Sequence, residues 1–75
     1  MIATKDIREK IEKNIPDSNA EVIAVKPDGM HFKAIVTSSS FNGKSMVEQH
    51  RMVYSSLEEE LKRNLHSLSI ETRET

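Results

Sequence analysis

The sequence predicts a small α+β domain with the element order α-β-β-α-α-β and a three-stranded sheet that helices cover on one face. Three observations predict this fold: isoleucines at four-residue spacing near the N-terminus, two β-rich segments joined by a Pro-Asp-Gly turn, and a period-two segment near the C-terminus. With 75 residues, the chain has room for one domain over 1–75, and its ordered core is expected over about 4–72.

The first predicted element is a helix over Thr4–Ile15. Its apolar positions recur every four residues, so they share one face, and charged side chains cover the opposite face. These positions are Ile7, Ile11 and Ile15. Thr4 is the expected N-cap, and Pro16 ends the helix because the residue before a proline disfavours helical backbone angles.

The next two elements are predicted to be strands that form a hairpin, over Glu21–Val25 and Met30–Thr37. The turn between them contains Pro27-Asp28-Gly29, in which proline fixes one backbone angle and glycine accepts a positive one. The second strand alternates, which predicts two distinct faces. One face carries Met30, Phe32, Ala34 and Val36, and the other carries His31, Lys33, Ile35 and Thr37.

After a loop over Ser38–Lys44, apolar positions follow a helical period almost to Leu65. The pattern Ser55-Ser56-Leu57-Glu58 resembles a capping box, so we expect two helices, Ser45–Tyr54 and Ser56–Asn64. The last segment, Leu65–Thr72, alternates with period two and predicts a third strand.

Composition excludes several classes of function. The 11 basic and 12 acidic side chains give a net charge of −1 with no long run of either sign, which argues against general binding to phosphate backbones. No apolar segment approaches the length of a membrane span, and the charged N-terminus does not resemble a signal peptide, so a cytoplasmic location is expected. Cysteine is absent, which excludes disulfides, a catalytic thiol and a self-sufficient thiolate metal site.

The segment Gly43-Lys44-Ser45 resembles the end of a phosphate-binding loop. The complete pattern requires a glycine five residues before Gly43, where this chain has Ser38, and Phe41 would crowd the phosphate. The preferred interpretation is therefore a glycine turn at the start of a helix, with Phe41 packed on the core.

Three histidines are the strongest candidates for metal binding or acid–base chemistry. His50 lies within the apolar stripe of its helix, which is typical of a core or rim residue. His31 opens the second strand opposite Phe32, and an exposed edge residue is the simplest interpretation. His66 begins the last strand, in register with Leu68 and Ile70, where a boundary residue is expected. Without cysteine or a spacing motif, the sequence gives only weak evidence for a metal site. It also shows no combination of a nucleophile, a base and an orienting residue that would indicate an enzyme.

The two middle helices also suggest a helix-turn-helix, which would bind DNA. The relevant basic residues are Lys44, Arg51, Lys62 and Arg63, and nearby glutamates offset their charge. A DNA-binding regulator is therefore one alternative. Another is simple homodimerisation through the open face of the sheet.

Four ordered blocks of sequence resemble the BolA-like family, in its compact bacterial branch, and together they cover about Glu21 to Thr72. The blocks are Asp28-Gly29-Met30-His31-Phe32, Phe41-Asn42-Gly43-Lys44-Ser45, Gln49-His50-Arg51-Met52-Val53-Tyr54 with Leu57 and Glu60, and Leu65-His66-Ser67-Leu68-Ser69-Ile70-Glu71-Thr72. The resemblance implies an α-β-β-α-α-β fold related to the type II KH domain, although no Gly-x-x-Gly clamp for nucleic acid is present.

The resemblance also implies a function. Similar proteins are non-enzymatic partners of a monothiol glutaredoxin and share a bridging [2Fe-2S] cluster, bound by the glutaredoxin cysteine, a glutathione thiol and histidine from the BolA-like side. Their roles are iron–sulfur cluster maturation or delivery and iron-status signalling, and some members are described as DNA-binding transcriptional regulators. The free protein is expected to hold no cofactor and to be a monomer or a weak homodimer.

The resemblance assigns roles to all three histidines. His66 matches the C-terminal histidine of the family and is the expected principal ligand. The second ligand comes from the region after the first strand, where His31 is the only histidine or cysteine of this chain. His50 matches the histidine of the family's His-Arg pair and is expected to be structural or supporting.

Overall fold

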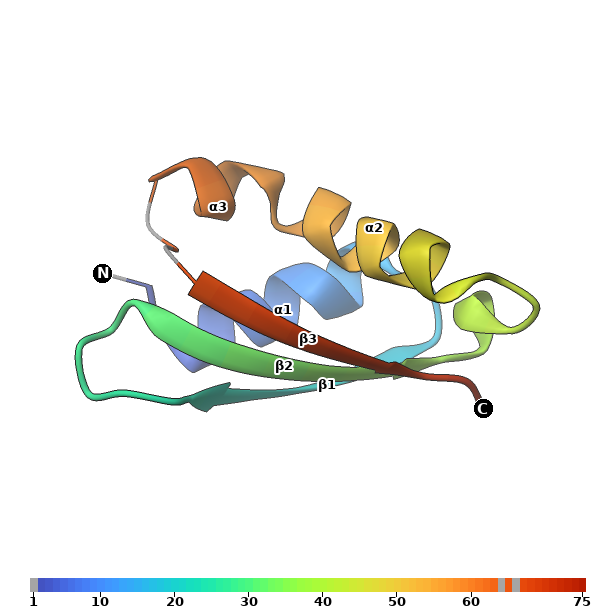
Figure 1. Cartoon of the computed structure of the whole chain (residues 1–75), viewed down its shortest axis with the longest axis horizontal. Coiled ribbons are helices and arrows are strands. Elements are labelled where there is room, and N and C mark those ends of the chain that lie inside the picture. The colour runs from blue at the N-terminus through green and yellow to red at the C-terminus, as the bar shows by residue number, and fades with distance from the viewer. Residues whose placement is uncertain (1, 64, 66) are drawn as a thin grey trace.

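The computed structural model describes residues 2–63, 65 and 67–75, which form three α-helices, one 3-10 turn and three strands. In chain order these are α1 (Thr4–Asn14), β1 (Ser18–Ala24), β2 (His31–Ser38), the 3-10 turn η1 (Ser39–Phe41), α2 (Met46–Ser56), α3 (Glu58–Arg63) and β3 (Ser67–Arg73) (Figure 1). The predicted α+β class and the order α-β-β-α-α-β are confirmed, whereas the relation to the type II KH domain stays a prediction.

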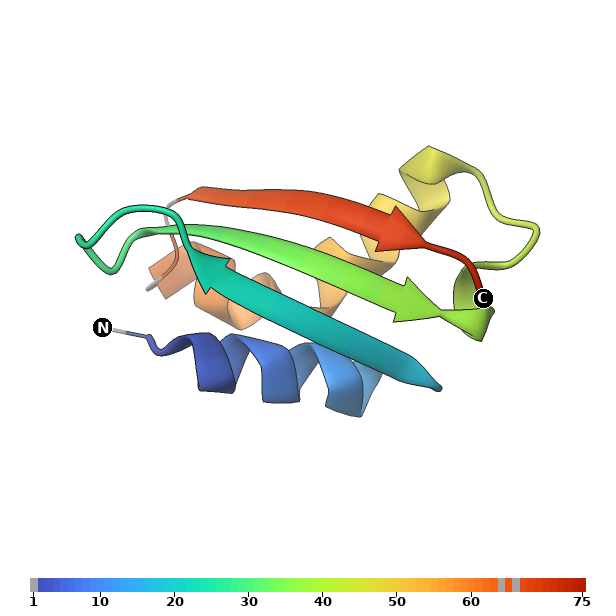
Figure 2. The same ribbon diagram turned by 90° about the horizontal axis from the view of Figure 1, so that it is seen from below.

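The sheet has β2 at its centre, with β1 and β3 on either side. β1 runs antiparallel to β2, which confirms the predicted hairpin, and β3 runs parallel to β2. Figures 1 and 2 show all three helices on one face of this sheet and the opposite face uncovered. A parallel pair needs a crossover connection, and η1, α2 and α3 supply it.

The N-terminal helix buries the three isoleucines whose spacing predicts it. Ile7, Ile11 and Ile15 are each at most 1% exposed, so the predicted apolar face is correct. The predicted N-cap is wrong: Thr4 is already helical and Ala3 precedes it, with its backbone N–H donating to the Asp6 carboxylate at 3.3 Å. An acidic side chain in the first turn thus stabilises the helix start where Ala3 has no side-chain acceptor.

Alternation along β2 places every second side chain in the core, as predicted. The buried residues of this strand are Phe32, Ala34, Val36 and Ser38. Met30 is an exception, because it precedes the strand and is 40% exposed. His31 is the first strand residue, on the opposite face from Phe32.

The break between α2 and α3 differs from the prediction. Ser55, the predicted cap, and Ser56 both belong to α2, so neither caps a second helix; the Ser56 hydroxyl donates to the Val53 carbonyl at 2.6 Å. The fully buried Leu57 ends α2 instead, and α3 begins at Glu58. The break between the two helices therefore falls at a residue of the hydrophobic core and not at a serine cap.

The last strand begins at Ser67, two residues later than predicted. Leu65 lies in the core at 2% exposure, and its backbone N–H donates to the Glu60 carbonyl at 2.8 Å. Leu65 therefore closes the end of α3 and does not join the sheet. The predicted end of the helix at Asn64, and His66, lie outside the described residues.

Candidate functional site

The turn between β1 and β2 is a closed structure built around Asp28. The Val25 backbone N–H donates to the His31 carbonyl at 2.9 Å, which brings the two ends of the turn together. Gly29 has a φ of 71°, in the left-handed region that glycine adopts without strain. The Met30 backbone N–H donates to Asp28 Oδ1 at 2.9 Å, so the aspartate fixes the conformation of the residues that follow it.

The second carboxylate oxygen of Asp28 contacts the imidazole of His31. Nδ1 of His31 lies 2.7 Å from Asp28 Oδ2, and both side chains are about one-third exposed. The Met30 N–H, and after it the His31 ring, hold the pKa of Asp28 below its ordinary value of 3.8. Asp28 is therefore an ionised acceptor at neutral pH, and the His31 ring points one nitrogen at it.

Parallel pairing brings the start of β3 beside this histidine. His31 pairs with Ser67 in the β2–β3 register, and the Ser67 N–H donates to the Met30 carbonyl at 3.1 Å. Ser67 directly follows His66, the predicted principal ligand, which lies outside the described residues. The fold thus joins the segments that carry the first and last predicted ligands, although they are far apart in sequence.

His50 occupies a different place, in the middle of α2. Its ring is partly buried, and within the described part of the chain Nε2 is buried with no hydrogen-bond partner. Only part of the predicted apolar stripe faces the core, since Val53 is fully buried whereas Val47 is 65% exposed and Tyr54 43% exposed. The interpretation of His50 as a rim residue of the helix layer agrees with this position.

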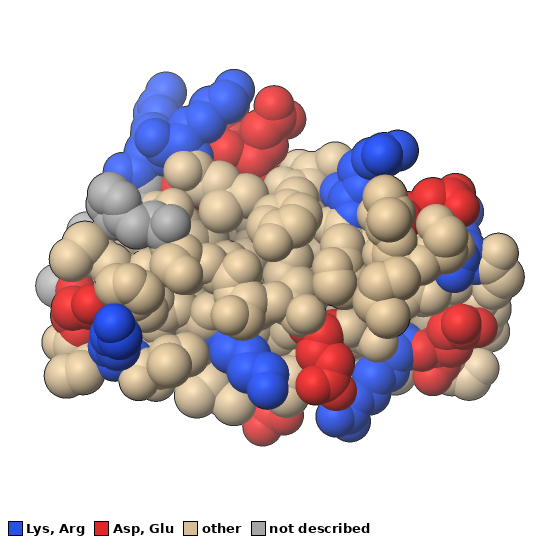
Figure 3. All heavy atoms as spheres, viewed as in Figure 1, with Lys and Arg blue, Asp and Glu red and all other residues tan. Residues whose placement is uncertain are grey.

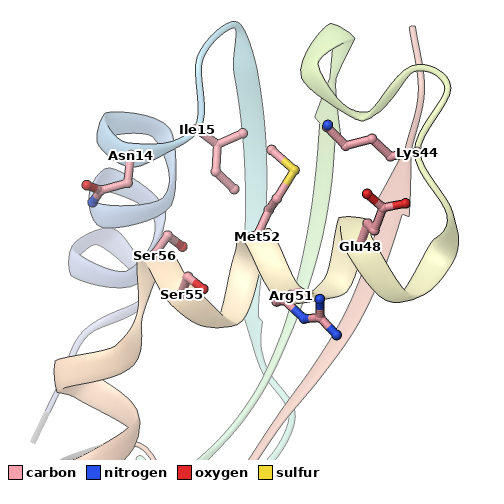
Figure 4. Close-up of a pocket in the computed structure, with 8 residues that line it drawn as sticks. All are labelled: Asn14, Ile15, Lys44, Glu48, Arg51, Met52, Ser55 and Ser56. Atoms are coloured by element: carbon pink, nitrogen blue, oxygen red, sulfur yellow. The ribbon is translucent and has the colours of Figure 1, made fainter.

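The helix layer carries two open grooves, one on each side of Arg51. The first, of about 500 Å³, is shown in Figure 4. Lys44, Glu48 and Arg51 are among the residues that line it. The second, of about 710 Å³, lies over α2 and α3 and is lined by Val47, His50, Arg51, Tyr54, Ser55, Glu58, Leu61 and Lys62. Its wall is mostly apolar.

Each of the four basic residues predicted for DNA binding has a carboxylate nearby. Lys62 pairs with Glu58 at 3.6 Å, and Arg63 pairs with Glu59 at 3.9 Å. On α2, the Ser45 backbone N–H and hydroxyl, with smaller contributions from Lys44 and Arg51, lower the pKa of Glu48. Figure 3 shows acidic groups beside the basic ones on the face it displays. The positive potential that a phosphate backbone requires is therefore weak here.

The pair of helices also departs from helix-turn-helix geometry. Leu57 alone joins α2 to α3, whereas a turn of about three or four residues is usual in that motif. The second helix begins with Glu58, Glu59 and Glu60, at the end that would face the bases.

The structure confirms the interpretation preferred from sequence for the loop that resembles a phosphate-binding loop: a glycine turn at the start of a helix. Phe41 is fully buried, and Gly43 has a φ of 80°. Ser45 caps α2, accepting from the Glu48 N–H, and the Glu48 carboxylate reaches back to the Ser45 N–H. A carboxylate thus occupies the helix start where a phosphate would bind. This loop and the β1–β2 turn lie at opposite ends of the molecule (Figures 1 and 2).

Comparison with known proteins agrees with the resemblance seen in the sequence. A family model described as BolA-like protein matches residues 9–75. The chain belongs to the BolA-like family. A solved structure of a bolA protein homologue from Coxiella burnetii is similar over 99% of this chain and 92% of its own, with 35% identity and a TM-score of 0.81.

Two relatives show that BolA-like sequences occur in proteins of different kinds. SufE-like protein 1 of Arabidopsis thaliana is 39% identical over 85% of this chain, and the chain spans only 21% of that protein. The DNA-binding transcriptional regulator BolA of Escherichia coli is 43% identical over 56% of this chain and 40% of its own length. A BolA-like segment therefore occurs both within a longer protein and in a named regulator.

Two further observations concern the part of this BolA-like chain that the structure describes. No helix there is long and apolar enough to cross a membrane. No group of three or more histidine, cysteine, aspartate or glutamate side chains in it is arranged to hold a metal ion. A metal bound by His31 would consequently need ligands from outside the described residues.

Two residues with clear structural roles were not identified from the sequence. Asp28 was assigned only to a turn, although an aspartate three residues before a histidine could have indicated their contact. Gln49 is buried, donating to the carbonyls of Phe41 and Lys44 and accepting from the Thr72 hydroxyl at 2.6 Å. It joins the loop, α2 and β3, and no local pattern signals this role.

Proposed function

We propose that this protein is a non-enzymatic, cytoplasmic partner of a monothiol glutaredoxin, with which it shares a glutathione-coordinated [2Fe-2S] cluster. Its part would be to present His66 and His31 as ligands to one iron. The proposal follows the BolA-like membership of the chain and the functions that the family resemblance implies: cluster maturation or delivery, or iron-status signalling.

One observation carries the proposal: His31 pairs across the sheet with Ser67, the residue after His66. The metal ligands that this chain offers fit one half of a site with mixed ligands. The chain offers imidazole and has no cysteine, so thiolates would come from the glutaredoxin and glutathione. Among the described residues, only His31 combines a partly exposed ring with a carboxylate partner, an arrangement common around metal-binding histidines.

Co-reconstitution tests this proposal. The protein would be mixed with a monothiol glutaredoxin, glutathione, iron and sulfide, and mass, visible absorption and circular dichroism recorded. We expect a one-to-one complex whose spectrum differs from that of the glutaredoxin homodimer. His66→Ala and His31→Ala should weaken the cluster, while His50→Ala, the matched control on α2, should leave its spectrum unchanged. A spectrum identical to the homodimer's would contradict the proposal.

DNA binding is a second candidate function, favoured by the likeness to the Escherichia coli regulator. It predicts an affinity that falls steeply with salt and depends on Lys44, Arg51, Lys62 or Arg63. Titration of duplex DNA at low ionic strength would test it, with the four residues changed singly to glutamine. No binding at low salt would eliminate this candidate.

A further inference from the structure

We propose that Asp28 is a positioning residue for His31. Its carboxylate holds the proton of the neutral ring on Nδ1 and so leaves the lone pair of Nε2 directed outward, as the single nitrogen able to bind iron. The inference rests on the proposed function, because it concerns how one ligand is presented. It adds a residue that acts on the iron only through His31, because it determines which ring nitrogen can bind.

The aspartate is fixed at both oxygens. Oδ1 accepts the Met30 backbone N–H at 2.9 Å, and Oδ2 lies 2.7 Å from His31 Nδ1, a distance typical of a charge-assisted hydrogen bond. The backbone hydrogen bond orients the carboxylate within the turn, and Gly29, at a φ of 71°, lets the chain bend closely enough for the second contact. The carboxylate therefore has one orientation relative to the ring.

The imidazole is held at its backbone as well as at its ring. The His31 carbonyl accepts from the Val25 N–H at 2.9 Å, and the residue pairs with Ser67 on the neighbouring strand. The side chain remains 36% exposed. A residue fixed by two backbone contacts and one ring contact, and still accessible, loses little conformational freedom when a ligand binds to it.

Hydrogen-bond chemistry then decides the tautomer. A neutral imidazole carries one N–H, and an ionised carboxylate can only accept, so the proton belongs on Nδ1 when Asp28 faces that nitrogen. Nε2 then keeps its lone pair. Losing a carboxylate partner of this kind typically costs about 10- to 100-fold in metal affinity.

The substitution Asp28→Asn keeps the shape of the side chain and changes its hydrogen-bonding groups. Asparagine Oδ1 can still accept the Met30 N–H, which places its NH₂ group against His31 Nδ1. A flipped amide would set two donors, the amide and the Met30 N–H, against each other and is disfavoured. The neutral ring must then accept at Nδ1 and carry its proton on Nε2, the nitrogen required for iron. Asp17→Asn is the matched control, since it removes a turn carboxylate that contacts Ser39 and neither of the two described histidines.

The first measurement uses the free protein, so it does not depend on a cluster. Nitrogen-15 NMR of the histidine rings, at a pH where they are neutral, should show His31 protonated on Nδ1 in the unmodified protein and in Asp17→Asn. It should show protonation on Nε2 in Asp28→Asn. Protonation of His31 on Nε2 in the unmodified protein would overturn the inference whatever the complex does.

The second measurement uses the co-reconstituted complex with a monothiol glutaredoxin and glutathione. Asp28→Asn should weaken cluster binding by about 10- to 100-fold, approaching His31→Ala, and Asp17→Asn should have no effect. If His31→Ala weakens the cluster but Asp28→Asn does not, the positioning role is wrong and the proposed function survives. If His31→Ala has no effect, or no shared cluster forms, the proposed ligand role of His31 fails and the inference fails with it, even where the tautomer changes as expected.

Discussion

His31 at the start of β2 and His50 in the middle of α2 differ in what their ring nitrogens contact. The His31 side chain is about one-third exposed, and one of its nitrogens lies 2.7 Å from an ionised carboxylate. In His50, Nε2 is buried and has no hydrogen-bond partner within the described part of the chain. The His31 ring therefore has one nitrogen held by a carboxylate, whereas one nitrogen of the His50 ring is enclosed within the helix layer. Local hydrogen bonding thus distinguishes the two rings.

The largest expected effect concerns the helix layer around His50. Leu57→Ala should lower the free energy of unfolding by about 2–5 kcal/mol, because it leaves a cavity under the junction of α2 and α3. Urea unfolding followed by far-ultraviolet circular dichroism would measure this loss. Leu57→Met, which nearly keeps the volume, should cost less than about 1.5 kcal/mol. An equal cost for both variants would show that shape at this position matters more than volume.

The next effect concerns the turn that holds His31. Gly29→Ala should cost about 1–2 kcal/mol, because a φ of 71° brings an added Cβ too close to the backbone. Gly29→Asn should cost less, since asparagine tolerates this conformation. The same urea titration gives both values. In the alanine variant we also expect the NMR signals of the His31 ring to shift while those of His50 stay in place; movement of both would mean that the two regions are not independent.

A smaller effect tests the start of α2, at the opposite end of the molecule from the turn. Ser45→Ala removes an N-cap and should cost about 1 kcal/mol at neutral pH. The folded-state pKa of Glu48 is lowered from 4.5, first by the Ser45 backbone N–H and then by the Ser45 hydroxyl. The stabilisation by Glu48 is therefore complete above about pH 4.5 and is lost as the pH falls through the lowered value.

The pH dependence of this cap can be isolated by comparing variants. Unfolding of the unmodified protein and of Glu48→Gln should be followed between neutral pH and about pH 3. The stability difference between them should be constant above the ordinary glutamate pKa and should shrink at lower pH. A difference that grew on acidification would have the wrong sign for a lowered carboxyl pKa.

The smallest expected effect concerns the ion pairs of α3. Changing Glu58 and Glu59 to glutamine should alter stability by no more than about 0.5 kcal/mol, because both carboxylates and the bases they face are well exposed. The variant also removes the negative charges that pair with Lys62 and Arg63, so their positive charges are no longer offset by these partners. A rise in affinity for duplex DNA at low salt would indicate that these residues reach the phosphates, and unchanged binding would indicate that they do not.

The elements of the fold could be predicted from the sequence because burial imposes periodicity. The isoleucines of α1 and the alternation of β2 each follow from one buried face, and both predictions were correct. The boundary between α2 and α3 was not predictable in this way. Ser55 and Glu58 fit a capping box by residue type, but Ser55 and Ser56 both lie inside α2, where the Ser56 hydroxyl donates to Val53, and the buried Leu57 ends the helix.

The candidate site was predicted less completely, for physical reasons. Residue types alone offer three histidines as donors, and the resemblance to the BolA-like family selects His31 and His66. The relation of these two residues depends on whether β3 pairs with β2 or with β1, and in which direction. The Asp28 contact depends on the conformation of a four-residue turn. The α2 stripe was ambiguous because apolar residues occupy more of the helix surface than the sheet covers, which leaves Val47 and Tyr54 exposed.

The parallel pairing of β2 with β3 has a consequence for folding. The β1–β2 hairpin is local and can form within microseconds, whereas β3 reaches β2 only after η1, α2 and α3 have crossed the sheet. Docking of β3 is thus expected to be a late step in folding. A chain released from the ribosome before that step has the carboxylate–histidine pair of the turn but not its neighbouring strand. The two proposed ligands, His31 and His66, would then come together only in a chain that has finished folding.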